Sequence, residues 1–414
     1  RSDLVDGAAN SYNIFFMQFN PDGSIDSTFG QNGVKKWVFN QRNSVNCITQ
    51  KGDKYYVCGY EAPGNGYSSF KAYVARFNSN GTPDSTFNGV GRVVELSGTN
   101  SVSSSFYTQL LVQDDGKIVA FGMETGNING GETKVVSRRY LTNGSIDPTF
   151  HPTAAYPSTP IPLNNYNSPG VYDAEGSIRF VFASEFSPAK IVSVKLDSLG
   201  ELVPTYGTNG VSITNIPASD ININRSFSGD NGSIWGFNSH TSTTSDFQIF
   251  KLDETGSPDA SYSSDGINDL IDFPGTNNQE AGHFMYRDSQ NRFWCMGSGS
   301  FAFTEPKGII YRTDDQGNID TSLEGTGYAS FTQFLYTTFR CAYFENDDEL
   351  IVGTFTNGYV GITRIKLIEE ILQIQNAGLD TICTGNQTLL NVIQPSECFT
   401  YQWKKDGVDI GVLN

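Results

Sequence analysis

The sequence predicts an all-β fold assembled from repeated units, and three observations lead to this prediction. The chain of 414 residues contains 43 glycines, 29 phenylalanines and 20 tyrosines, which is typical of many short strands joined by tight turns. Its length exceeds the usual single-core size of ~100 to 200 residues. One turn motif also returns at a nearly constant interval, so an architecture that grows by repetition is favoured over separate domains.

The motif is "NPDGSIDSTFG" at residues 20–30, and it returns as "NSNGTPDSTFNG" at 78–89 and "LTNGSIDPTF" at 141–150. Weaker copies follow at 252–262 and 313–323. The turn glycines repeat with a period of about 59 residues, which suits a propeller blade of four antiparallel strands. The motif residues that define this repeat are Gly23, Asp26, Phe29, Gly81, Asp84, Phe87, Gly144, Asp147 and Phe150.

We expect the motif to join the outer strand of one blade to the inner strand of the next. Glycine permits positive φ, Asp and Ser/Thr hydrogen-bond nearby amides, and the phenylalanine is an apolar group expected to lodge between blades. Apolar segments after the motif, such as "GVKKWVF" from Gly33 and "GRVVEL" from Gly91, are then first strands. Segments before it, such as "AYVARFN" at 72–78, are then fourth strands.

A hairpin turn lines up in all six periods, and its Asp-Gly and Asn-Gly pairs tolerate positive φ. The turns are centred on Gly52-Asp53, Asp115-Gly116, Glu175-Gly176, Asn231-Gly232, Gln290-Asn291 and Asn346-Asp347.

The first of these turns places Cys47 and Cys58 directly opposite each other on antiparallel strands. The pair is either a cross-strand disulfide or two buried thiols, and thiols are favoured because the geometry of such disulfides is often poor. Counting outward in the same way from the turn at Asn346-Asp347 places Cys341 opposite Val352. Cys295 and Cys341 are expected to be free.

Six complete blades are expected between about Gly33 and Leu367, and the strands before them belong to another blade. The sequence therefore predicts a seven-bladed ring whose first blade lacks two strands, which are missing or supplied from outside. A ring of six blades is the alternative. The predicted domains are a propeller at 1–367, a connector at 368–380 and a further module at 381–414.

The motif copies "FMQFNPDGSIDSTFGQNGV" (16–34) and "YVARFNSNGTPDSTFNGVGRV" (73–93) resemble the delta-60 repeat proteins, predicted β-propellers of bacteria. The resemblance weakens in later repeats, where Tyr206, Tyr262 and Leu323 replace the motif phenylalanine. It implies a protein of Bacteroidota type that is secreted or exposed at the cell surface. The type nine secretion system of the outer membrane is then its export machinery.

Residues 381–414 resemble the opening of the Ig-like modules in surface proteins of Bacteroidota, with Trp403 on the strand that packs into the sandwich. Cys383 and Cys398 bracket a hairpin in this module and are the preferred disulfide pair. Exported proteins of this group are often O-glycosylated at Asp-Ser/Thr followed by an apolar or small residue, so Thr381 is the candidate modification site.

Charge and hydropathy exclude two classes of partner. The chain has 44 acidic and 27 basic residues and a formal net charge of −17, which repels nucleic acid and anionic membranes. No apolar run approaches the ~20 residues of a membrane span, so no transmembrane segment is expected.

Catalytic and metal motifs were sought without success. The three histidines, His151, His240 and His283, have neither metal nor triad spacing, so no catalytic or metal residue is assigned and no cofactor is expected. Calcium in acidic turns such as 314–320 is a weaker expectation than solvated turns. "SGDNGSIW" at 228–235 matches the Asp-box of sialidases and related propellers, but it falls on the aligned hairpin turn and is interpreted as structural.

The leading hypothesis is a non-enzymatic binding or adhesion module that recognises an extracellular protein or glycan surface. A glycan-cleaving propeller enzyme with paired carboxylates and a passive spacer are the alternatives. Binding is expected on the connections between third and fourth strands, which differ from blade to blade. Their aromatic contacts would be Tyr67, Phe70, Phe186, Phe301 and Phe303; the alternative is that these rings tuck under neighbouring blades.

Overall fold

The computed structural model divides the chain into two compact units, Arg1–Lys366 and Leu367–Asn414. The described residues are 14–37, 42–62, 70–95, 104–125, 133–151, 163–164, 170–172, 176–184, 189–216, 221–240, 247–268, 271, 276–301, 306–331, 337–346, 349–356, 359–366, 374–376, 390–392, 402–405 and 408–412. The second unit contains two two-stranded sheets, β25 (Ile374–Asn376) with β26 (Leu390–Val392) and β27 (Gln402–Lys405) with β28 (Val408–Val412).

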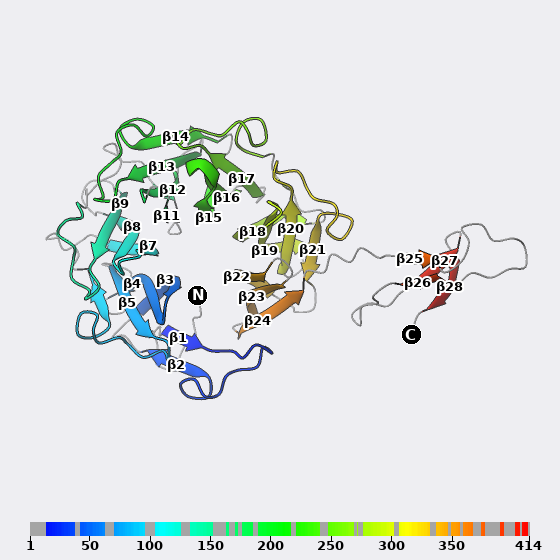
Figure 1. Cartoon of the computed structure of the whole chain (residues 1–414), viewed down its shortest axis with the longest axis horizontal. Helices are drawn as coiled ribbons and strands as arrows, with labels where there is room; N and C mark the ends of the chain where they lie inside the picture. Colours follow the sequence, from blue (N-terminus) through cyan, green and yellow to red (C-terminus); the bar gives the residue numbers. More distant parts are fainter. Residues whose placement is uncertain are drawn as a thin grey trace, which may run out of the picture. The chain divides into compact units, whose positions relative to one another are not determined.

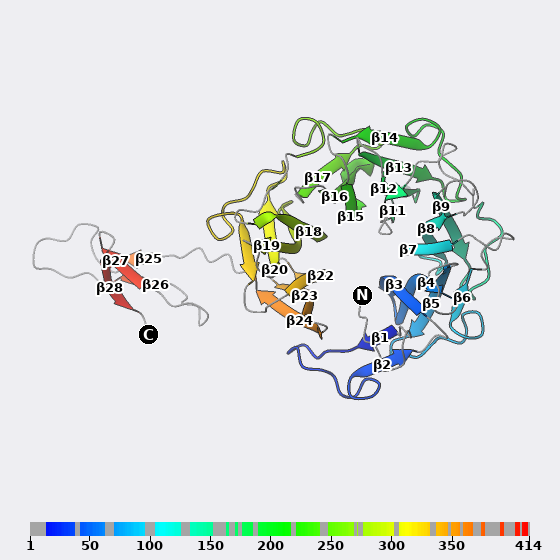
Figure 2. The same cartoon turned by 180° about the vertical axis from the view of Figure 1, so that it is seen from behind.

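The first unit confirms the predicted all-β fold. Its described residues form seven antiparallel sheets that follow one another around a ring, the arrangement of a β-propeller (Figures 1 and 2). In the described residues the one helical element is the 3-10 turn Asp230–Gly232, and no helix there is long and apolar enough to span a membrane.

The sheets are numbered 1 to 7 in chain order. They are β1 (Ile14–Met17) and β2 (Val34–Trp37); β3 (Arg42–Lys51), β4 (Lys54–Ala62), β5 (Lys71–Asn78) and β6 (Arg92–Val94); β7 (Ser104–Val112), β8 (Ile118–Thr125) and β9 (Thr133–Tyr140); β10 (Leu163–Asn164), β11 (Gly170–Tyr172), β12 (Ile178–Ser184), β13 (Lys190–Leu196) and β14 (Val211–Asn215); β15 (Ile221–Ser228), β16 (Ile234–His240) and β17 (Phe247–Leu252); β18 (Thr276–Arg287), β19 (Phe293–Phe301), β20 (Pro306–Thr313) and β21 (Tyr328–Phe331); and β22 (Thr337–Asn346), β23 (Glu349–Thr356) and β24 (Tyr359–Lys366).

The turn motif has a different place in the fold from the one predicted. In sheet 2 the motif at 78–89 connects β5 to β6, and these strands pair with each other, so it is a long hairpin loop within one sheet. The motif loops of sheets 1, 4 and 6 are placed in the same way. The segments from Gly33 and Gly91 are therefore outermost strands, not first strands. A strand that folds back and a strand that crosses over give the same sequence pattern, which explains the error.

Hydrogen bonds inside the motif fix the shape of this loop. In sheet 3, Asp147 Oδ1 accepts from the backbone N (2.9 Å) and Oγ1 (2.7 Å) of Thr149, and its Oδ2 accepts from Arg139 Nε at 2.8 Å. Asp84 makes the same contacts in sheet 2. Burial alone would raise the pKa of both carboxyls, but these bonds outweigh it and hold each pKa at about 2.

In five motif copies the aromatic residue packs against the turn glycine of the next sheet, which agrees with the predicted position between sheets. Phe87 is fully buried in the core between sheets 2 and 3. A Cβ on these glycines would strike the ring, because nonbonded carbon atoms rarely approach within 3.4 Å. The distances are 2.7 Å for Gly81 on Phe29, 3.2 Å for Gly144 on Phe87, 2.7 Å for Gly200 on Phe150 and 2.5 Å for Gly256 on Tyr206.

A repeated arginine contact links sheet 2 to sheet 3, sheet 3 to sheet 4 and sheet 7 to sheet 1. Arg76 of β5 donates to Thr142 O at 2.6 Å, and Arg139 of β9 donates to Ser198 O at 2.6 Å. Both acceptors are the second residue of the motif turn in the following sheet. Arg364 of β24, the equivalent residue of sheet 7, donates to the equivalent acceptor of sheet 1, Pro21 O, at 3.1 Å. The last sheet thus contacts the first as sheets 2 and 3 contact their successors.

The innermost hairpins of sheets 2, 3, 5, 6 and 7 carry a β-bulge at the same place. The register of β3 shifts between Val45 and Cys47, which leaves Asn46 as the extra residue. The equivalent extra residues of β7, β15, β18 and β22 are Thr108, Asn224, His283 and Arg340. The bulge divides the strand into two segments of opposite facing. One predicted register was wrong: Cys341 pairs with Gly353, not with Val352, because Asn346 pairs with Glu349 instead of lying in the turn and the register shifts again between Phe344 and Asn346.

The hairpin turns agree with the prediction where the structure describes them. Gly52, Gly116, Gly232 and Asn291 all have positive φ, while Glu175 and Asp347 lie outside the described residues. The register also places Cys47 directly opposite Cys58. No disulfide joins them, and the buried Cys295 is not in a disulfide either; burial and the adjacent Cys47 raise the pKa of the Cys58 thiol.

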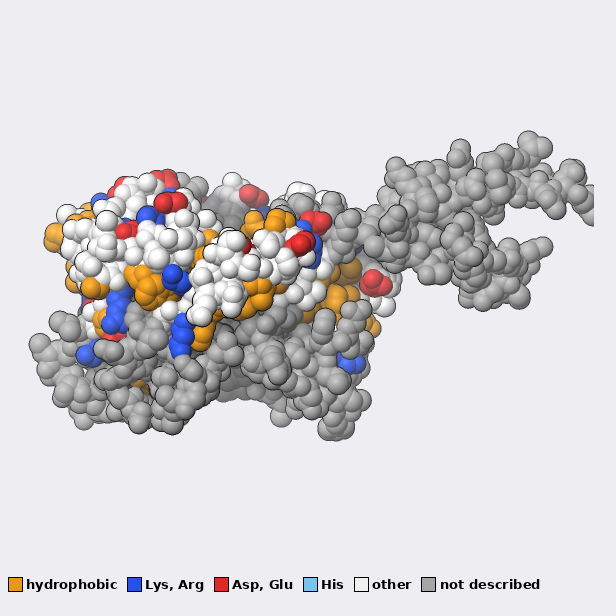
Figure 3. Space-filling model, turned by 90° about the horizontal axis from the view of Figure 1, so that it is seen from below, with side chains coloured by type: hydrophobic (Ala, Val, Ile, Leu, Met, Phe, Trp, Pro, Cys, Tyr) orange, Lys and Arg blue, Asp and Glu red, His pale blue; other side chains and the backbone are white. Residues whose placement is uncertain are grey.

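Charges are dispersed over the side of the first unit that Figure 3 shows. Acidic and basic side chains of the described residues alternate there with apolar ones. The net charge of −17 therefore does not gather into one acidic patch on this side.

Truncating the buried Phe87 side chain should destabilise the propeller far more than truncating an exposed side chain of the same loop. For Phe87→Ala we expect a loss of about 3–5 kcal/mol of unfolding free energy, because the ring fills the space between two sheets. Val90→Ala, in the same loop but 66% exposed, is the matched control and should change it by less than about 0.5 kcal/mol. Urea denaturation compares the two, and equal midpoints would contradict the packing.

Lowering the pH should reduce the free energy of unfolding over a limited pH range. Asp84, Asp147 and Asp259 have pKa values of about 2, below the ordinary 3.8. Their contribution is complete above the unfolded-state pKa and is lost as pH falls from about 4 to 2, by at most ~2 kcal/mol each. Denaturant midpoints measured between pH 6 and pH 2.5 test this, and Asp147→Asn should flatten the slope below pH 4.

Candidate functional site

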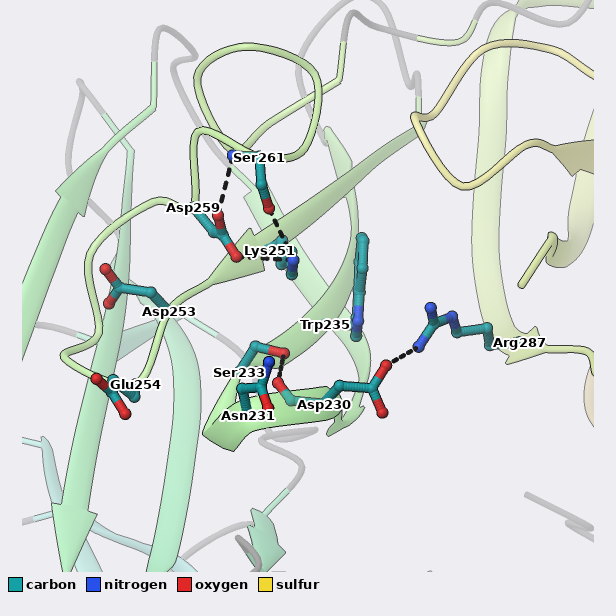
Figure 4. A pocket seen from close by; sticks show the side chains of 10 residues that line it. All are labelled: Asp230, Asn231, Ser233, Trp235, Lys251, Asp253, Glu254, Asp259, Ser261 and Arg287. Atoms are coloured by element: carbon teal, nitrogen blue, oxygen red, sulfur yellow. Dashed lines mark hydrogen bonds and ion pairs between the residues drawn. The ribbon is translucent and has the colours of Figure 1, made fainter.

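A cavity of about 460 Å³ opens between sheets 5 and 6. Its walls come from the β15–β16 turn, the adjoining strands β16 and β17, the motif loop that follows β17, and the end of β18 (Figure 4). The lining residues are Asp230, Asn231, Ser233, Trp235, Lys251, Asp253, Glu254, Asp259, Ser261 and Arg287. We call this cavity the rim pocket.

The floor of the rim pocket is the "SGDNGSIW" hairpin, whose turn geometry agrees with the structural interpretation. Asn231 has a φ of 54°, and Ser233 bonds Asp230 O through both its backbone N (3.1 Å) and its Oγ (2.7 Å). Asp230 is left with its carboxylate pointing outward, where it pairs with Arg287 at 3.4 Å. The turn therefore builds the pocket as well as the hairpin.

Trp235 stands between two cations. Lys251 Nζ lies 5.2 Å from its ring centroid and the Arg287 guanidinium lies 5.4 Å from it, within the range of cation–π attraction. Trp235 is also nearly buried. Its faces are thus occupied, so the ring shapes the pocket but does not offer a stacking surface.

The carboxylates of the rim pocket are mostly committed to the protein. Asp259 pairs with Lys251 at 2.7 Å and accepts from Ser261 N; burial raises its pKa, but these contacts prevail and hold it at about 2. Asp253 Oδ1 accepts three bonds from its own loop, from Thr255 N, Thr255 Oγ1 and Ser257 N. Asp253 and Glu254 lie across the pocket from Arg287 in Figure 4.

This arrangement favours binding of a polar group over acid–base catalysis. A general acid needs a pKa near the working pH, whereas Asp259 stays ionised down to about pH 2. Hydroxyl, amide and carboxylate groups line a volume within the usual range for ligand pockets, about 300–1,000 Å³. The side chains of the pocket can therefore donate hydrogen bonds to a ligand and accept hydrogen bonds from it, and such binding requires no proton transfer.

The predicted aromatic contacts do not line the rim pocket, and the structure describes them only in part. Of these residues the structure describes the side chain of Phe70, which is half-buried and packs on Tyr60 (4.9 Å) and Phe106 (5.2 Å). This is the tucked arrangement named as the alternative. The backbone of Phe301 ends β19. Tyr67, Phe186 and Phe303 lie outside the described residues, as do Cys383, Cys398 and Thr381.

The topology places the variable connections together. They join second strands to third strands, not third to fourth, and their flanking strand ends lie on the face opposite the motif loops and the inner turns. We call this the loop face.

Metal ligation finds no support among the described residues, where no group of three or more His, Cys, Asp or Glu side chains is placed to hold an ion. In the acidic turn at 314–320, Asp314 Oδ1 accepts from Gln316 N and Asn318 N. Part of the turn at 345–350 lies outside the described residues.

Sequence reasoning did not identify the rim pocket. It identified the Asp-box turn but assigned no role to Lys251 or Arg287. The available signal was the lysine itself: Arg76, Arg139 and Arg312 occupy this position in other sheets, and a lysine cannot reproduce the fork of an arginine.

Comparison with known proteins supports the architecture. A family model described as "Domain of unknown function (DUF5122) beta-propeller" matches residues 4–29, 53–87 and 113–150. The chain is therefore similar to this propeller family over its first repeats. No curated protein matches the chain.

Similar solved structures include enzymes. A Dyadobacter fermentans protein of unknown function is 13% identical over 86% of this chain and 98% of its own, with a TM-score of 0.43. A Trypanosoma rangeli sialidase is 10% identical over 88% and 58%, with a TM-score of 0.43. A Bacillus subtilis arabinanase is 12% identical over 64% and 92%, with a TM-score of 0.34. At these values the likeness says nothing of what this chain binds.

Arg287 and Arg312, both in sheet 6, should contribute differently to the free energy of unfolding. Arg287→Met removes a 3.4 Å pair with the exposed Asp230 and cation–π contacts with Trp235 and Phe293, and should cost about 1 kcal/mol of unfolding free energy. Arg312→Met removes a buried guanidinium, 1% exposed, that pairs with Asp320 at 2.7 Å, and should cost about 3–5 kcal/mol. Urea denaturation measures both, and a costly Arg287→Met would show that the pocket wall is structural.

Proposed function

We propose that the propeller is a non-enzymatic binding module of a secreted or cell-surface protein. The rim pocket holds a polar group of its ligand, a glycan or protein of the extracellular surface. The observation that carries this proposal is the lining of the rim pocket, which combines carboxylate, hydroxyl and amide groups in about 460 Å³. Such a lining suits the hydroxyl groups of a sugar residue or the polar groups of a peptide.

The setting of this function is the extracellular surface. The resemblance of the motifs to exported repeat proteins supports passage through the type nine secretion system, with the outer-membrane export machinery as a partner. The Ig-like module expected at 381–414 would then separate the propeller from the cell. The dispersed charge of Figure 3 fits a protein ligand or a neutral glycan and does not require a polyion.

The rival enzyme hypothesis is weaker on chemical grounds. Glycoside cleavage uses two carboxyl groups, one of which is a protonated acid at the working pH. In the rim pocket, Asp259 is held ionised by Lys251 and Asp253 is bonded to its own loop. A passive spacer would have no need of a pocket.

A glycan array and a panel of immobilised extracellular proteins test the proposal. The intact chain should bind a subset, and the double variant Asp230→Asn, Glu254→Gln should weaken that binding at least tenfold by removing acceptors from the pocket. Asp53→Asn is the matched control, because Asp53 is an exposed acid in the equivalent turn of sheet 2. Replacing 63–69, 185–188 and 302–305 by short glycine turns tests the loop face separately.

Three outcomes would contradict the proposal. Binding that survives the pocket variant but not the loop replacement would move the site to the loop face. Release of sugar products from any bound glycan would favour the enzyme. No binding to either panel would favour the spacer.

A further inference from the structure

The innermost hairpin of sheet 2 places two cysteines directly opposite each other. Cys47 of β3 pairs with Cys58 of β4, and the register runs without a shift from this pair to the turn at 52–53. Opposite residues of an antiparallel pair have Cα atoms about 4.5 or 5.5 Å apart, and both distances lie within the range of about 4.4–6.8 Å that a disulfide spans. The backbone spacing at this pair therefore suits a disulfide.

Both side chains point to the same side of the sheet. Opposite residues of an antiparallel pair share a face, and Cys47 packs against the core of sheets 2 and 3 that contains Cys58. The two thiols also hydrogen-bond each other. The sulfur atoms are thus neighbours before any bond forms between them.

The β-bulge beside Cys47 relieves the strain that led the sequence analysis to favour two thiols. Disulfides between opposite strands are often strained because a regular ladder holds both strands on either side of the pair. Here the extra residue Asn46 interrupts the ladder directly before Cys47, and a bulged strand bends and twists more than a regular one. β3 can therefore adjust at Cys47 without breaking the pairs nearer the turn.

The two thiols differ in their access to solvent. Cys47 is half-buried, whereas Cys58 is fully buried, and burial together with the contact to Cys47 raises the pKa of the Cys58 thiol. A dissolved reagent therefore meets Cys47 first, and Cys58 reacts only with a group already attached to Cys47. This is the order of steps in an intramolecular thiol–disulfide exchange.

Among the described residues no other cysteine lies opposite a cysteine. Cys341 of β22 follows the bulge of sheet 7 as Cys47 follows the bulge of sheet 2, but it pairs with Gly353. The buried Cys295 of β19 pairs with Met285 and Tyr311. Cys341 and Cys295 are therefore matched controls, the first for the place beside the bulge and the second for burial.

We propose that Cys47 and Cys58 form a reversible disulfide when the protein meets a small disulfide, RSSR, and that this bond braces the inner hairpin of sheet 2. The Cys47 thiolate attacks one sulfur of RSSR, forms a mixed disulfide and releases RS⁻. Cys58 then loses its proton and attacks the Cys47 sulfur, which releases the second RS⁻. The two protein thiols are oxidised, their protons end on the two RSH molecules, and RSSR is the only oxidant required.

The brace acts on one hairpin and on the interface that it helps to form. The bond would close the loop of residues 48–57, and a disulfide stabilises mainly by restricting the unfolded chain. Because Cys58 belongs to the core between sheets 2 and 3, the same interface would gain stability. The rim pocket lies between sheets 5 and 6, so the inference goes beyond the proposed function and does not depend on it.

Oxidised glutathione is the probe, and a peptide map of the full chain is the measurement. After alkylation of the remaining thiols, trypsin cleaves behind Arg42, Lys51, Lys54 and Lys71 and so separates the two cysteines. A disulfide should hold peptides 43–51 and 55–71 together until dithiothreitol releases them.

Three results of this map would overturn the inference. The first is that peptides 43–51 and 55–71 are found separate and alkylated. The second is a glutathione adduct that persists on Cys47 in the unaltered chain. The third is equal linkage at Cys295 or Cys341, because the reaction would then not depend on the opposed pair.

Cys58→Ala separates the two steps of the exchange. The mixed disulfide on Cys47 then has no thiol to resolve it, so one glutathione should stay bound to Cys47. Cys341→Ala should leave the linkage of 43–51 to 55–71 unchanged. A Cys58→Ala chain that takes up no glutathione at Cys47 would contradict the proposed order of steps.

Thermal melting of the unaltered chain tests the brace itself. The melting temperature in oxidised glutathione should exceed that in dithiothreitol by several degrees. Cys47→Ser, which keeps every other cysteine, should lose that rise. A rise of the same size in Cys47→Ser, or no rise in the unaltered chain, would overturn the inference.

Discussion

The structure depends on the contact between the aromatic residue of one motif loop and the turn glycine of the next. At Gly200 and Gly256 any side chain would strike the neighbouring ring, Phe150 or Tyr206, at less than 3 Å. The glycine is therefore needed for space as well as for its positive φ. Because Gly81, Gly144, Gly200 and Gly256 each receive the ring of the preceding motif, successive sheets are held together by the same contact. The repeated arginine contact then adds a directional bond to the same interface.

This constraint also explains how much could be predicted from the sequence. The glycine and the aromatic residue must recur with every sheet, so the period and the all-β fold were readable. The path of the chain after the motif could not be predicted, because neither residue indicates whether the next strand pairs with the strand before the motif or belongs to the next sheet. The bulges were equally hidden. The extra residues are all polar but of different types: Asn46, Thr108, Asn224, His283 and Arg340. The register was right at Cys47, which pairs without a shift as far as the turn, and wrong at Cys341, because a further shift lies between Phe344 and Asn346.

The rim pocket was missed for a related reason. Its Asp-box turn is local, but Arg287 comes from the next sheet, and its distance from Asp230 follows from the ring rather than from the sequence. The pocket also lies where Lys251 replaces the arginine of other sheets. Arg139 reaches past its own loop to the next sheet, whereas Lys251 bonds within its loop to Asp259 and Ser261. A shorter reach at this position leaves room between sheets 5 and 6.

A neighbouring departure supports this account. Sheet 4 has Lys195 at the arginine position and Val203 at the motif aspartate position, so the usual ion pair cannot form there. Arg179, one strand further in, instead donates to Asp253 O (3.2 Å) and Glu254 O (3.1 Å), which holds one wall of the rim pocket from behind. The repeat thus fixes most positions of the ring by packing alone, and selection for binding can act only where packing is relaxed. The rim pocket is such a place, where a shorter cation stands at the arginine position.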